Sequence, residues 1–237
     1  MNTPTELSFD CHIDDSVYKV KSPMIGIYNV SNCLAALATC VKGLGIPSER
    51  AVAALATQKT VPGRMERIDL GQNFTAIVDF AHTPNALAVS LETARTLTQG
   101  KVIAVFGSAG LRDREKRKMM PVESIRRADM SILTAEDPRT ESLDAILQDM
   151  ADAAVAAGGV EGQNFLRVAD RGDAIRKAIA LAQPGDLVIS LGKGHEQSMC
   201  FITTEYDWDD RTAMRAALAE HLSVEGPKMP WLPTSES

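Results

Sequence analysis

The sequence predicts an α/β fold, a mostly parallel sheet flanked by helices, over the greater part of its 237 residues. Two observations carry this prediction. Short runs of β-branched and aliphatic residues recur along the chain, as in strands that are buried on both faces of a parallel sheet. Amphipathic stretches of helical length separate the runs, and strands that alternate with helices form open parallel sheets with right-handed crossovers.

The predicted strands are short apolar runs, at 75–79, 101–106, 130–134, 165–168 and 186–191. Helices are expected between and after them, near 84–99, 116–128, 141–157, 171–183 and 209–221. Thr83 can cap the first of these helices, and Pro84 suits its first turn. Residues 224–237 contain prolines and are expected to form a disordered tail.

The segment before the sheet has a different pattern of apolar residues. Residues 6–22 read as two strand-like runs around Asp14-Asp15-Ser16, which predicts a hairpin. Apolar residues from Val30 to Leu44 recur with helical period, and a second helix is expected at 48–56 with Ser48 as its N-cap. Two strands and two helices bury little core. The expected domains are therefore 1–61 and 62–223, followed by the tail at 224–237.

Composition excludes several classes of protein. With 25 basic and 31 acidic residues the formal net charge is −6, which argues against a general nucleic-acid binder. The four cysteines show neither CxxC spacing nor a histidine cluster, which is typical of a reducing cytoplasm and not of structural zinc or a disulfide framework. The N-terminus lacks a leader pattern, and the longest apolar stretch is shorter than the ~20 residues that cross a bilayer. We therefore expect a cytoplasmic protein without membrane or nucleic-acid partners.

Charged or glycine-containing loops follow four of the predicted strands, at 79–84, 106–118, 134–141 and 191–196. Ligands of open parallel sheets bind beyond the carboxyl ends of the strands, so these loops are the candidate site. The first loop either presents Asp79 and His82 to a ligand or only caps a helix. The basic run in the second loop either holds an anionic group or is a solvated helix face.

The third and fourth loops mix acidic and basic side chains. Arg139 can clamp a substrate carboxylate through two nitrogens, or it can pair with Glu136 or Glu141. The fourth loop places a flexible backbone beside Lys193, His195 and Glu196, but it lacks the spacing of a phosphate-binding P-loop.

Taken in order, the motifs resemble those of the Mur ligases of peptidoglycan synthesis, and more narrowly of the members that add the third residue of the stem peptide. The resemblance extends from about residue 7 to 221. It rests on the run 26–36 with its two asparagines, Pro62-Gly63-Arg64-Met65-Glu66, Asp79-Phe-Ala-His82-Thr-Pro84, Phe106-Gly107, Arg112-Asp113, Lys116-Arg117, Asp137-Pro138-Arg139 and Gly192-Lys193-Gly194-His195-Glu196. It implies a Rossmann-like C-terminal Mur ligase domain, preceded by a remnant of the central ATPase domain.

The resemblance also implies an activity. In the family, ATP phosphorylates a substrate carboxylate, an amine attacks the acyl phosphate, and ADP and phosphate leave. The implied cofactors are ATP and Mg²⁺, with the metal ligands mostly outside this chain. The implied substrates are UDP-N-acetylmuramoyl-L-alanyl-D-glutamate, a UDP-muramoyl dipeptide, and a diamino acid, meso-diaminopimelate or lysine. We expect a monomer.

Site residues transfer from the resemblance position by position. Those that match the nucleotide site are Asn29, Asn32, Arg64, Asp79 and His82. Those that match the site for the added amino acid are Arg112, Glu136, Asp137, Pro138, Arg139, Gly192 and Glu196. No catalytic or metal-ligating residue is assigned. A diaminopimelate zwitterion needs cations for its carboxylates and an anion for its ammonium, and Arg112, Arg139 and Glu196 supply both signs.

The sequence departs from the family in two respects. Glu136-Asp137-Pro138-Arg139 stands where the diaminopimelate enzymes usually carry Asp-Asn-Pro-Arg, and Leu111 stands where an acidic residue is common. The chain also carries no GKT/S phosphate loop, so we expect it to be inactive alone.

Three other functions are alternatives to a Mur ligase. A non-catalytic amino-acid- or nucleotide-binding module of the same fold is the alternative function. An NAD-dependent enzyme is disfavoured because no G-x-G-x-x-G follows the first strand of the sheet. Ligases of the folate-polyglutamate or cyanophycin type fit the last two motifs less well.

Overall fold

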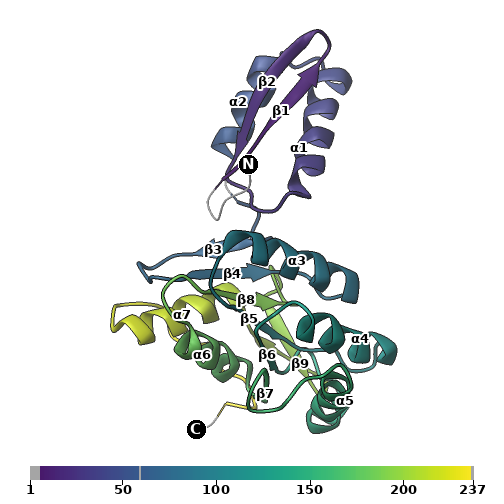
Figure 1. Ribbon diagram of the computed structural model, residues 1–237, viewed down its shortest axis with the longest axis vertical. Coiled ribbons are helices and arrows are strands. Elements are labelled where there is room, and N and C mark those ends of the chain that lie inside the picture. The colour runs from purple at the N-terminus through teal and green to yellow at the C-terminus, as the bar shows by residue number, and fades with distance from the viewer. Residues whose placement is uncertain (1–5, 59, 236–237) are drawn as a thin grey trace. The chain divides into compact units, whose positions relative to one another are not determined.

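The computed structural model describes residues 6–58 and 60–235. The chain divides into two compact units, Met1–Val61 and Pro62–Ser237 (Figure 1). Each unit is built around its own hydrophobic core.

The smaller unit is a hairpin with two helices packed against it. Strands β1 (Leu7–Ile13) and β2 (Ser16–Ser22) pair antiparallel, as the sequence predicts. Helix α1 (Asn29–Ala38) continues into a π-helical turn (Thr39–Gly43), and α2 spans Ser48–Thr57. The prediction of Ser48 as N-cap is wrong, because Ser48 is already helical and Pro47, without a side-chain cap, precedes it. The unit's core consists of Cys11, Val20, Cys33, Leu37, Ala51 and Leu55.

The larger unit is built on a six-stranded sheet of order β3-β4-β8-β5-β6-β7. Its strands are β3 (Glu66–Ile68), β4 (Thr75–Asp79), β5 (Val102–Phe106), β6 (Met130–Leu133), β7 (Phe165–Arg167) and β8 (Leu187–Leu191). Strand β3 runs antiparallel to β4, and the other pairs are parallel. The prediction of a mostly parallel sheet is confirmed. Strand β3 was not predicted, because three residues that include two charges carry no period-2 signal.

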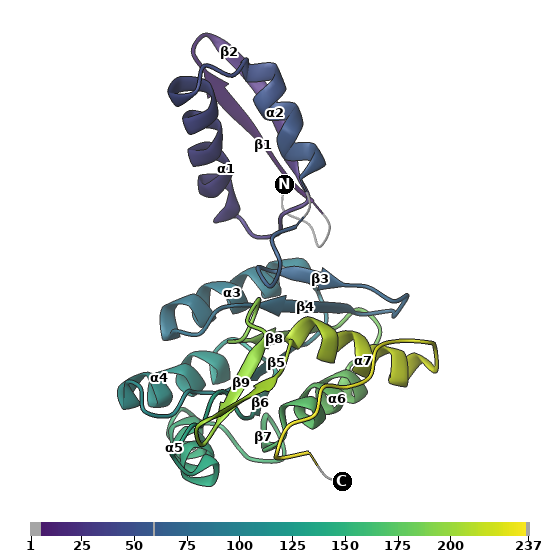
Figure 2. The ribbon, with the colours of Figure 1, turned by 180° about the vertical axis from the view of Figure 1, so that it is seen from behind.

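Helices cover both faces of this sheet, with α3 (Pro84–Leu97), α4 (Arg114–Ile125) and α5 (Leu143–Ala156) on one face. Figures 1 and 2 show α6 (Arg171–Leu181) and α7 (Asp210–Leu222) on the other face. The cap predicted for α3 is confirmed, since Thr83 Oγ1 accepts from Ala86 N at 3.2 Å and Pro84 lies in the first turn. Because the strands are buried from both sides, they consist of apolar residues almost without a break.

A second hairpin and the tail complete the larger unit. Strands β9 (Ser198–Phe201) and β10 (Thr204–Asp207) pair antiparallel and follow the β8 loop. The expectation of a disordered tail is wrong for the residues up to 235. Leu232 is fully buried, the Trp231 ring contacts Tyr206, and Thr234 and Ser235 both donate to Asp170. These contacts hold the proline-containing segment against the larger unit.

None of the helices in the described ranges combines the length and the apolar character that a membrane span requires.

Candidate functional site

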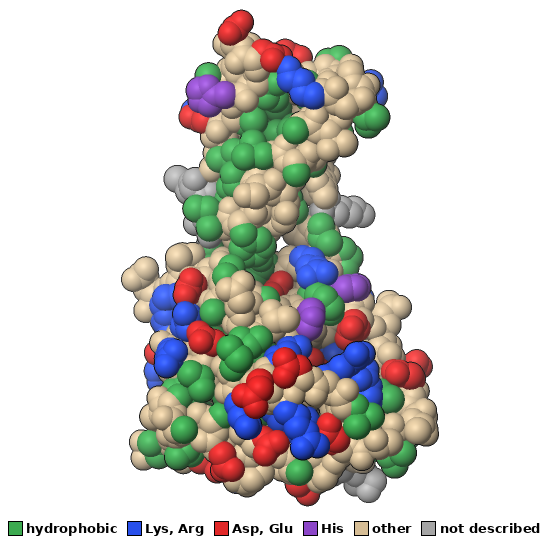
Figure 3. Space-filling model, turned by 90° about the vertical axis from the view of Figure 1, so that its right-hand side faces the viewer, with side chains coloured by type: hydrophobic (Ala, Val, Ile, Leu, Met, Phe, Trp, Pro, Cys, Tyr) green, Lys and Arg blue, Asp and Glu red, His purple; other side chains and the backbone are tan. Residues whose placement is uncertain are grey.

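Three loops of the larger unit meet beyond the carboxyl ends of β5, β6 and β8. Gly110 N, in the loop after β5, donates to Asp137 O at 3.0 Å, and Arg139 Nη1 lies 3.4 Å from Gly110 O. Lys193 Nζ, in the loop after β8, lies 3.0 Å from Asp137 Oδ1. The β6 loop is therefore bonded to both of its neighbours. Figure 3 shows one face of the larger unit on which basic and acidic side chains gather close to histidines.

The backbone of the β6 loop is held in an uncommon conformation. Asp137 and Arg139 have φ values of 42° and 53°, in the left-handed region that side chains other than glycine rarely adopt. The β9 hairpin holds this shape, since Arg139 N donates to Cys200 O at 3.1 Å and Ile202 N donates to Arg139 O at 2.8 Å. Such conformations cost about 1–3 kcal/mol each and concentrate at functional sites. The second hairpin thus serves as the support of this loop.

The geometry disfavours the pairing of Arg139 with an acidic neighbour in its own loop. Within the described residues Arg139 forms no ion pair with Glu136 or Glu141. Glu141 Oε2 instead accepts from Arg117 Nη2 at 2.9 Å. At 3.4 Å, the contact of Arg139 with Gly110 O is long for a hydrogen bond, so a carboxylate can compete for the guanidinium.

Glu136, at the start of the β6 loop, is buried and not exposed on the surface of the loop. It is 6 % exposed, and its Oε2 has no hydrogen-bond partner among the described residues. Burial raises the pKa of Glu136 to about 7, against the opposing charges of Arg171, Lys116 and Lys193. Gly192 has φ of 112°, and a Cβ there would lie 2.3 Å from Glu136 Oε2. The backbone angle of Gly192 therefore favours glycine, and a side chain there would displace the Glu136 carboxyl group.

The Glu136→Gln variant is expected to change how stability depends on pH. The folded chain binds the Glu136 proton more tightly than the unfolded chain does, so the free energy of unfolding falls as pH rises from about 4.5 to about 7. The loss is on the order of 3 kcal/mol. Glutamine has no such loss, so the variant gains stability relative to the unaltered chain at pH 8 but not at pH 4. Urea unfolding followed by tryptophan fluorescence measures both values, since Trp208 and Trp231 both lie in the larger unit.

The control for this measurement is Glu225→Gln, which changes an exposed carboxyl group beyond α7. It is expected to leave the unfolding free energy unchanged at both pH values. A Glu136→Gln effect that is equal at pH 4 and pH 8 would contradict the raised pKa.

The remaining residues predicted for the amino acid lie around this loop. Pro138 is buried, and Arg112 is exposed two residues after Gly110. Glu196 is half-buried, with its Oε2 2.8 Å from Lys193 Nζ. The structure thus joins Asp137 and Glu196 through Lys193, it places Arg139 in the same loop as Asp137, and it leaves Arg112 at the solvent side.

Asp79, which the sequence predicts at the nucleotide site, organises the end of β4. Its carboxylate accepts from Met65 N at 2.9 Å, Ala81 N at 3.1 Å and Ser90 Oγ at 2.8 Å. These bonds fix the segment before β3 and the turn into α3 together. Asp79 therefore sets the backbone that carries Arg64 and His82.

The ring of Phe80 gathers the other side chains at this end of the sheet. The Arg64 guanidinium lies 4.3 Å from the ring centroid, which is a cation–π contact. The rings of His82 and His195 contact the same ring, with centroids 4.5 and 4.8 Å away. His82 Nδ1 also lies 2.9 Å from Phe80 O. Phe80 thus joins two of the predicted nucleotide residues to the β8 loop.

Gly63 allows the segment before β3 to lie directly on the β8 loop. Its φ is 63°, and a Cβ at this position would lie 2.1 Å from the carbonyl carbon of Gly194. The two backbones are in direct contact, so a side chain at Gly63 would separate them. This contact places Arg64 beside the loop that carries Glu196.

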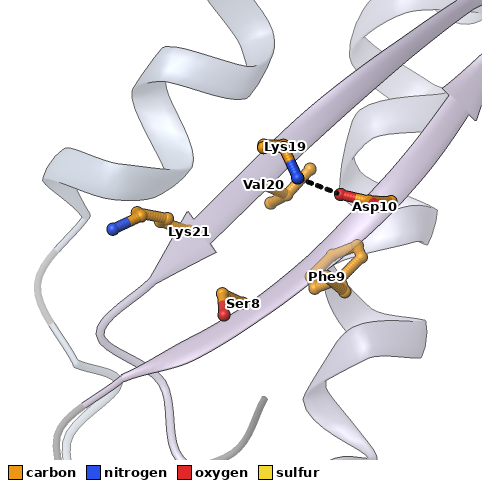
Figure 4. A pocket seen from close by; sticks show the side chains of 6 residues that line it. All are labelled: Ser8, Phe9, Asp10, Lys19, Val20 and Lys21. Carbon is orange, nitrogen blue, oxygen red and sulfur yellow. Dashed lines mark ion pairs between the residues drawn. The ribbon is translucent and has the colours of Figure 1, made fainter.

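Asn29 and Asn32 lie in the smaller unit. Asn29 is buried at the start of α1 and donates to Ile25 O at 2.7 Å, and Asn32 Nδ2 donates to Asn29 Oδ1 at 2.7 Å. The exposed Asn32 is thus oriented by the buried Asn29. A hollow in the same unit is lined by Ser8, Phe9, Asp10, Lys19, Val20 and Lys21 (Figure 4). The Asp10–Lys19 ion pair beside this hollow is exposed and contributes little to the stability of the fold.

No group of three or more histidine, cysteine, aspartate or glutamate side chains in the described part of the chain could hold a metal ion. The described residues on their own therefore do not form a Mg²⁺ site.

Sequence reasoning missed two groups that shape the site. Lys193 lies in the Gly192–Glu196 motif, and the sequence predicts no role for it, although a lysine three residues before Glu196 at a strand end indicates an ion pair. Arg171 gave no signal. It is buried at the start of α6, and it donates to Ala135 O at 3.2 Å and Leu191 O at 2.8 Å, the carbonyls just before Glu136 and Gly192.

Comparison with known proteins identifies the fold of the larger unit. The sequence model of one family, described as the glutamate ligase domain of Mur ligases, matches residues 63–194, more than half of the chain. The chain belongs to the Mur ligase family. Mur ligases depend on ATP and Mg²⁺.

Curated relatives narrow the likeness within the Mur ligases. A UDP-N-acetylmuramyl-tripeptide synthetase of Roseiflexus sp. (strain RS-1) is 49% identical over 197 residues, which are 83% of this chain and 38% of the relative. A UDP-N-acetylmuramoyl-L-alanyl-D-glutamate–2,6-diaminopimelate ligase of Geobacillus thermodenitrificans (strain NG80-2) is 40% identical over 218 residues, 92% of this chain and 44% of the relative. The chain thus spans about two fifths of the length of these relatives.

Solved structures agree with this assignment. A UDP-N-acetylmuramoyl-L-alanyl-D-glutamate–2,6-diaminopimelate ligase matches with a TM-score of 0.64 at 33% identity, covering 90% of this chain and 43% of that one. The UDP-N-acetylmuramate-alanine ligase of Thermotoga maritima matches with a TM-score of 0.65 at 18% identity, covering 94% and 44%. The second likeness concerns the fold alone.

Proposed function

We propose that this chain is the amino-acid-binding portion of an ATP-dependent ligase that adds meso-diaminopimelate to UDP-N-acetylmuramoyl-L-alanyl-D-glutamate in peptidoglycan synthesis. The observation that carries the proposal is the bonded group of Asp137, Lys193 and Glu196 at the ends of β6 and β8, with Arg139 two residues after Asp137 in the same loop. It combines a guanidinium that a carboxylate can reach with a carboxylate that can receive an ammonium. The names of the relatives support the same substrate class.

The side chains divide the recognition of the amino acid between them. Arg139 binds the distal carboxylate, and the exposed Arg112 assists at the solvent side. Glu196 accepts hydrogen bonds from an ammonium group. In the reaction, the γ-phosphoryl group of ATP passes to the carboxylate of the dipeptide, and the amine then displaces phosphate to form the amide. This chain's part is to hold the diamino acid in place.

Nucleotide-binding roles are proposed for residues of each unit taken by itself. In the smaller unit these residues are Asn29 and Asn32, and in the larger unit they are Arg64, Asp79 and His82. The smaller unit is proposed to be part of the central domain of a Mur ligase. We place the reaction in the cytoplasm, where ATP is available, and propose a monomer.

Calorimetric titration of the chain with meso-diaminopimelate and with L-lysine tests the proposal. Losing one charge-assisted contact of about 1.5–3 kcal/mol weakens binding about tenfold or more. Lysine lacks the distal carboxylate, so meso-diaminopimelate is expected to bind about tenfold more tightly. Tighter binding of lysine, or no binding of either amino acid, would overturn the proposed substrate.

The chain by itself is not expected to turn over ATP. Its sequence contains no GKT/S loop, and the charge of a transferring phosphoryl group needs the compensation that such a loop and its metal provide. The measurement is ADP release in the presence of Mg²⁺, the UDP-muramoyl dipeptide and meso-diaminopimelate. ADP release that depends on both substrates would show that the chain is a complete catalyst.

A further inference from the structure

Lys193 is a buried cation at the junction of two site loops. It follows Gly192 at the end of β8, and the whole residue is 2 % exposed. Lysine is almost never buried to this degree unless its charge is paired. A lysine buried to this degree therefore requires acidic partners for its ammonium.

Two carboxylates from different loops share this ammonium. Lys193 Nζ lies 3.0 Å from Asp137 Oδ1 and 2.8 Å from Glu196 Oε2. Burial opposes the charge of Lys193, but Asp137 and Glu196 outweigh it, so its pKa lies above the ordinary value. The ammonium is charged at neutral pH and bridges the β6 loop to the β8 loop.

The same oxygen of Asp137 also accepts from Cys200 N at 2.9 Å. Asp137 is therefore occupied by one ammonium and one backbone N–H, and its charge is balanced within the protein. The Asp137 carboxylate would otherwise lie as a bare negative charge two residues before Arg139. Lys193 thus prevents Asp137 from attracting a second cation to the place where Arg139 can bind a carboxylate.

The charge balance of this group determines which amino acid suits it. Lys193 and Arg139 are positive, and Asp137 and Glu196 are negative, so the charges of these four side chains sum to zero. meso-Diaminopimelate carries two carboxylates and two ammonium groups and is also neutral, whereas lysine carries one positive charge in excess. Without the Lys193 ammonium the group would be negative, and it would favour the cation over the zwitterion.

We propose that Lys193 is a positioning residue that sets the preference of the site for a diamino dicarboxylic acid over a diamino monocarboxylic acid, by neutralising Asp137 and holding Glu196 in place. This inference rests on the proposed function, because it assigns a role within the same amino-acid site. Lys193 influences the choice of amino acid without itself contacting the distal carboxylate.

The test is calorimetric titration of the full chain and three variants with meso-diaminopimelate and L-lysine. The variants are Lys193→Met, Asp137→Asn and the double variant Lys193→Met/Asp137→Asn. Lys193→Met is expected to lower the ratio of the two affinities, diaminopimelate over lysine, about tenfold. The double variant removes the unbalanced carboxylate as well, and it is expected to restore the ratio to within about threefold of the unaltered chain.

The single variant Asp137→Asn tests the effect of charge on binding even if Lys193→Met fails to fold. Asparagine tolerates the left-handed backbone of this position, so the variant is expected to fold even where Lys193→Met does not. It leaves the Lys193 charge in excess and is expected to raise the ratio about threefold or more. Recovery of the ratio in the double variant is a result that a purely structural role of Lys193 would not produce.

The outcomes distinguish a failure of the role of Lys193 from a failure of the proposed function. If the unaltered chain binds neither amino acid, the proposed function fails and this inference fails with it. If the unaltered chain prefers diaminopimelate but the ratio is the same in all variants that fold, only the role of Lys193 is overturned. A lower ratio in Asp137→Asn would also overturn it.

Discussion

Replacing Arg171 by methionine is expected to lower the free energy of unfolding of the larger unit by about 3–5 kcal/mol. Arg171 and Asp210 are both fully buried, with Arg171 Nη2 2.7 Å from Asp210 Oδ2. Burial by itself would raise the pKa of Asp210, but Arg171 outweighs this effect and keeps it below the ordinary value. Without the guanidinium, a buried charge loses its partner, and the carbonyls of Ala135 and Leu191 lose their donor. Urea unfolding followed by tryptophan fluorescence measures the loss.

The matched control is Arg176→Met, on the same helix. Arg176 also joins α6 to α7, through Glu220, but this pair is exposed, at 38% for Arg176 and 49% for Glu220. Exposed pairs contribute about 0–1 kcal/mol, so the control is expected to lose far less stability. Equal losses in the two variants would contradict the account of Arg171 as a buried clamp.

Replacing Arg139 by alanine is expected to weaken the binding of meso-diaminopimelate about tenfold or more. The guanidinium is proposed to bind the distal carboxylate, and its own contact with Gly110 O is long, at 3.4 Å. The affinity for L-lysine, which has no distal carboxylate, is expected to change much less. Calorimetric titration with both amino acids gives the two values.

The charge-matched control is Arg126→Ala at the far end of α4, where Arg126 is 64% exposed beside Glu123. It removes one positive charge away from the site and is expected to leave both affinities unchanged. Unfolding midpoints of both variants show whether the fold is intact. An Arg139→Ala variant that folds and binds meso-diaminopimelate as before would show that the β6 loop has been assigned wrongly.

Sequence alone predicts those strands that consist of consecutive apolar residues. The parallel strands are apolar because helices cover both faces of the sheet. Each of these strands, β4 to β8, therefore carries its own sequence signal. The loops that join at the site were also predictable, because ligand sites of such sheets lie beyond the carboxyl ends of the strands.

Other parts depend on contacts between distant residues. The β9 hairpin is short and follows a loop. Its role is visible only in the fold, where Arg139 N donates to Cys200 O and Ile202 N donates to Arg139 O. The packing of the tail depends on Leu232 meeting the core and on the hydroxyls of Thr234 and Ser235 meeting Asp170. The bridge of Lys193 to Asp137 joins residues 56 positions apart, which no local pattern encodes.

The most direct test of the central claim is a crystal structure of the chain with meso-diaminopimelate. We expect the distal carboxylate of the amino acid within hydrogen-bond distance of the Arg139 guanidinium, and an ammonium group beside Glu196, with the Lys193–Asp137 pair intact. A diaminopimelate molecule bound away from the loops after β6 and β8, or one whose ammonium meets Arg139, would contradict the claim that these loops form the amino-acid site.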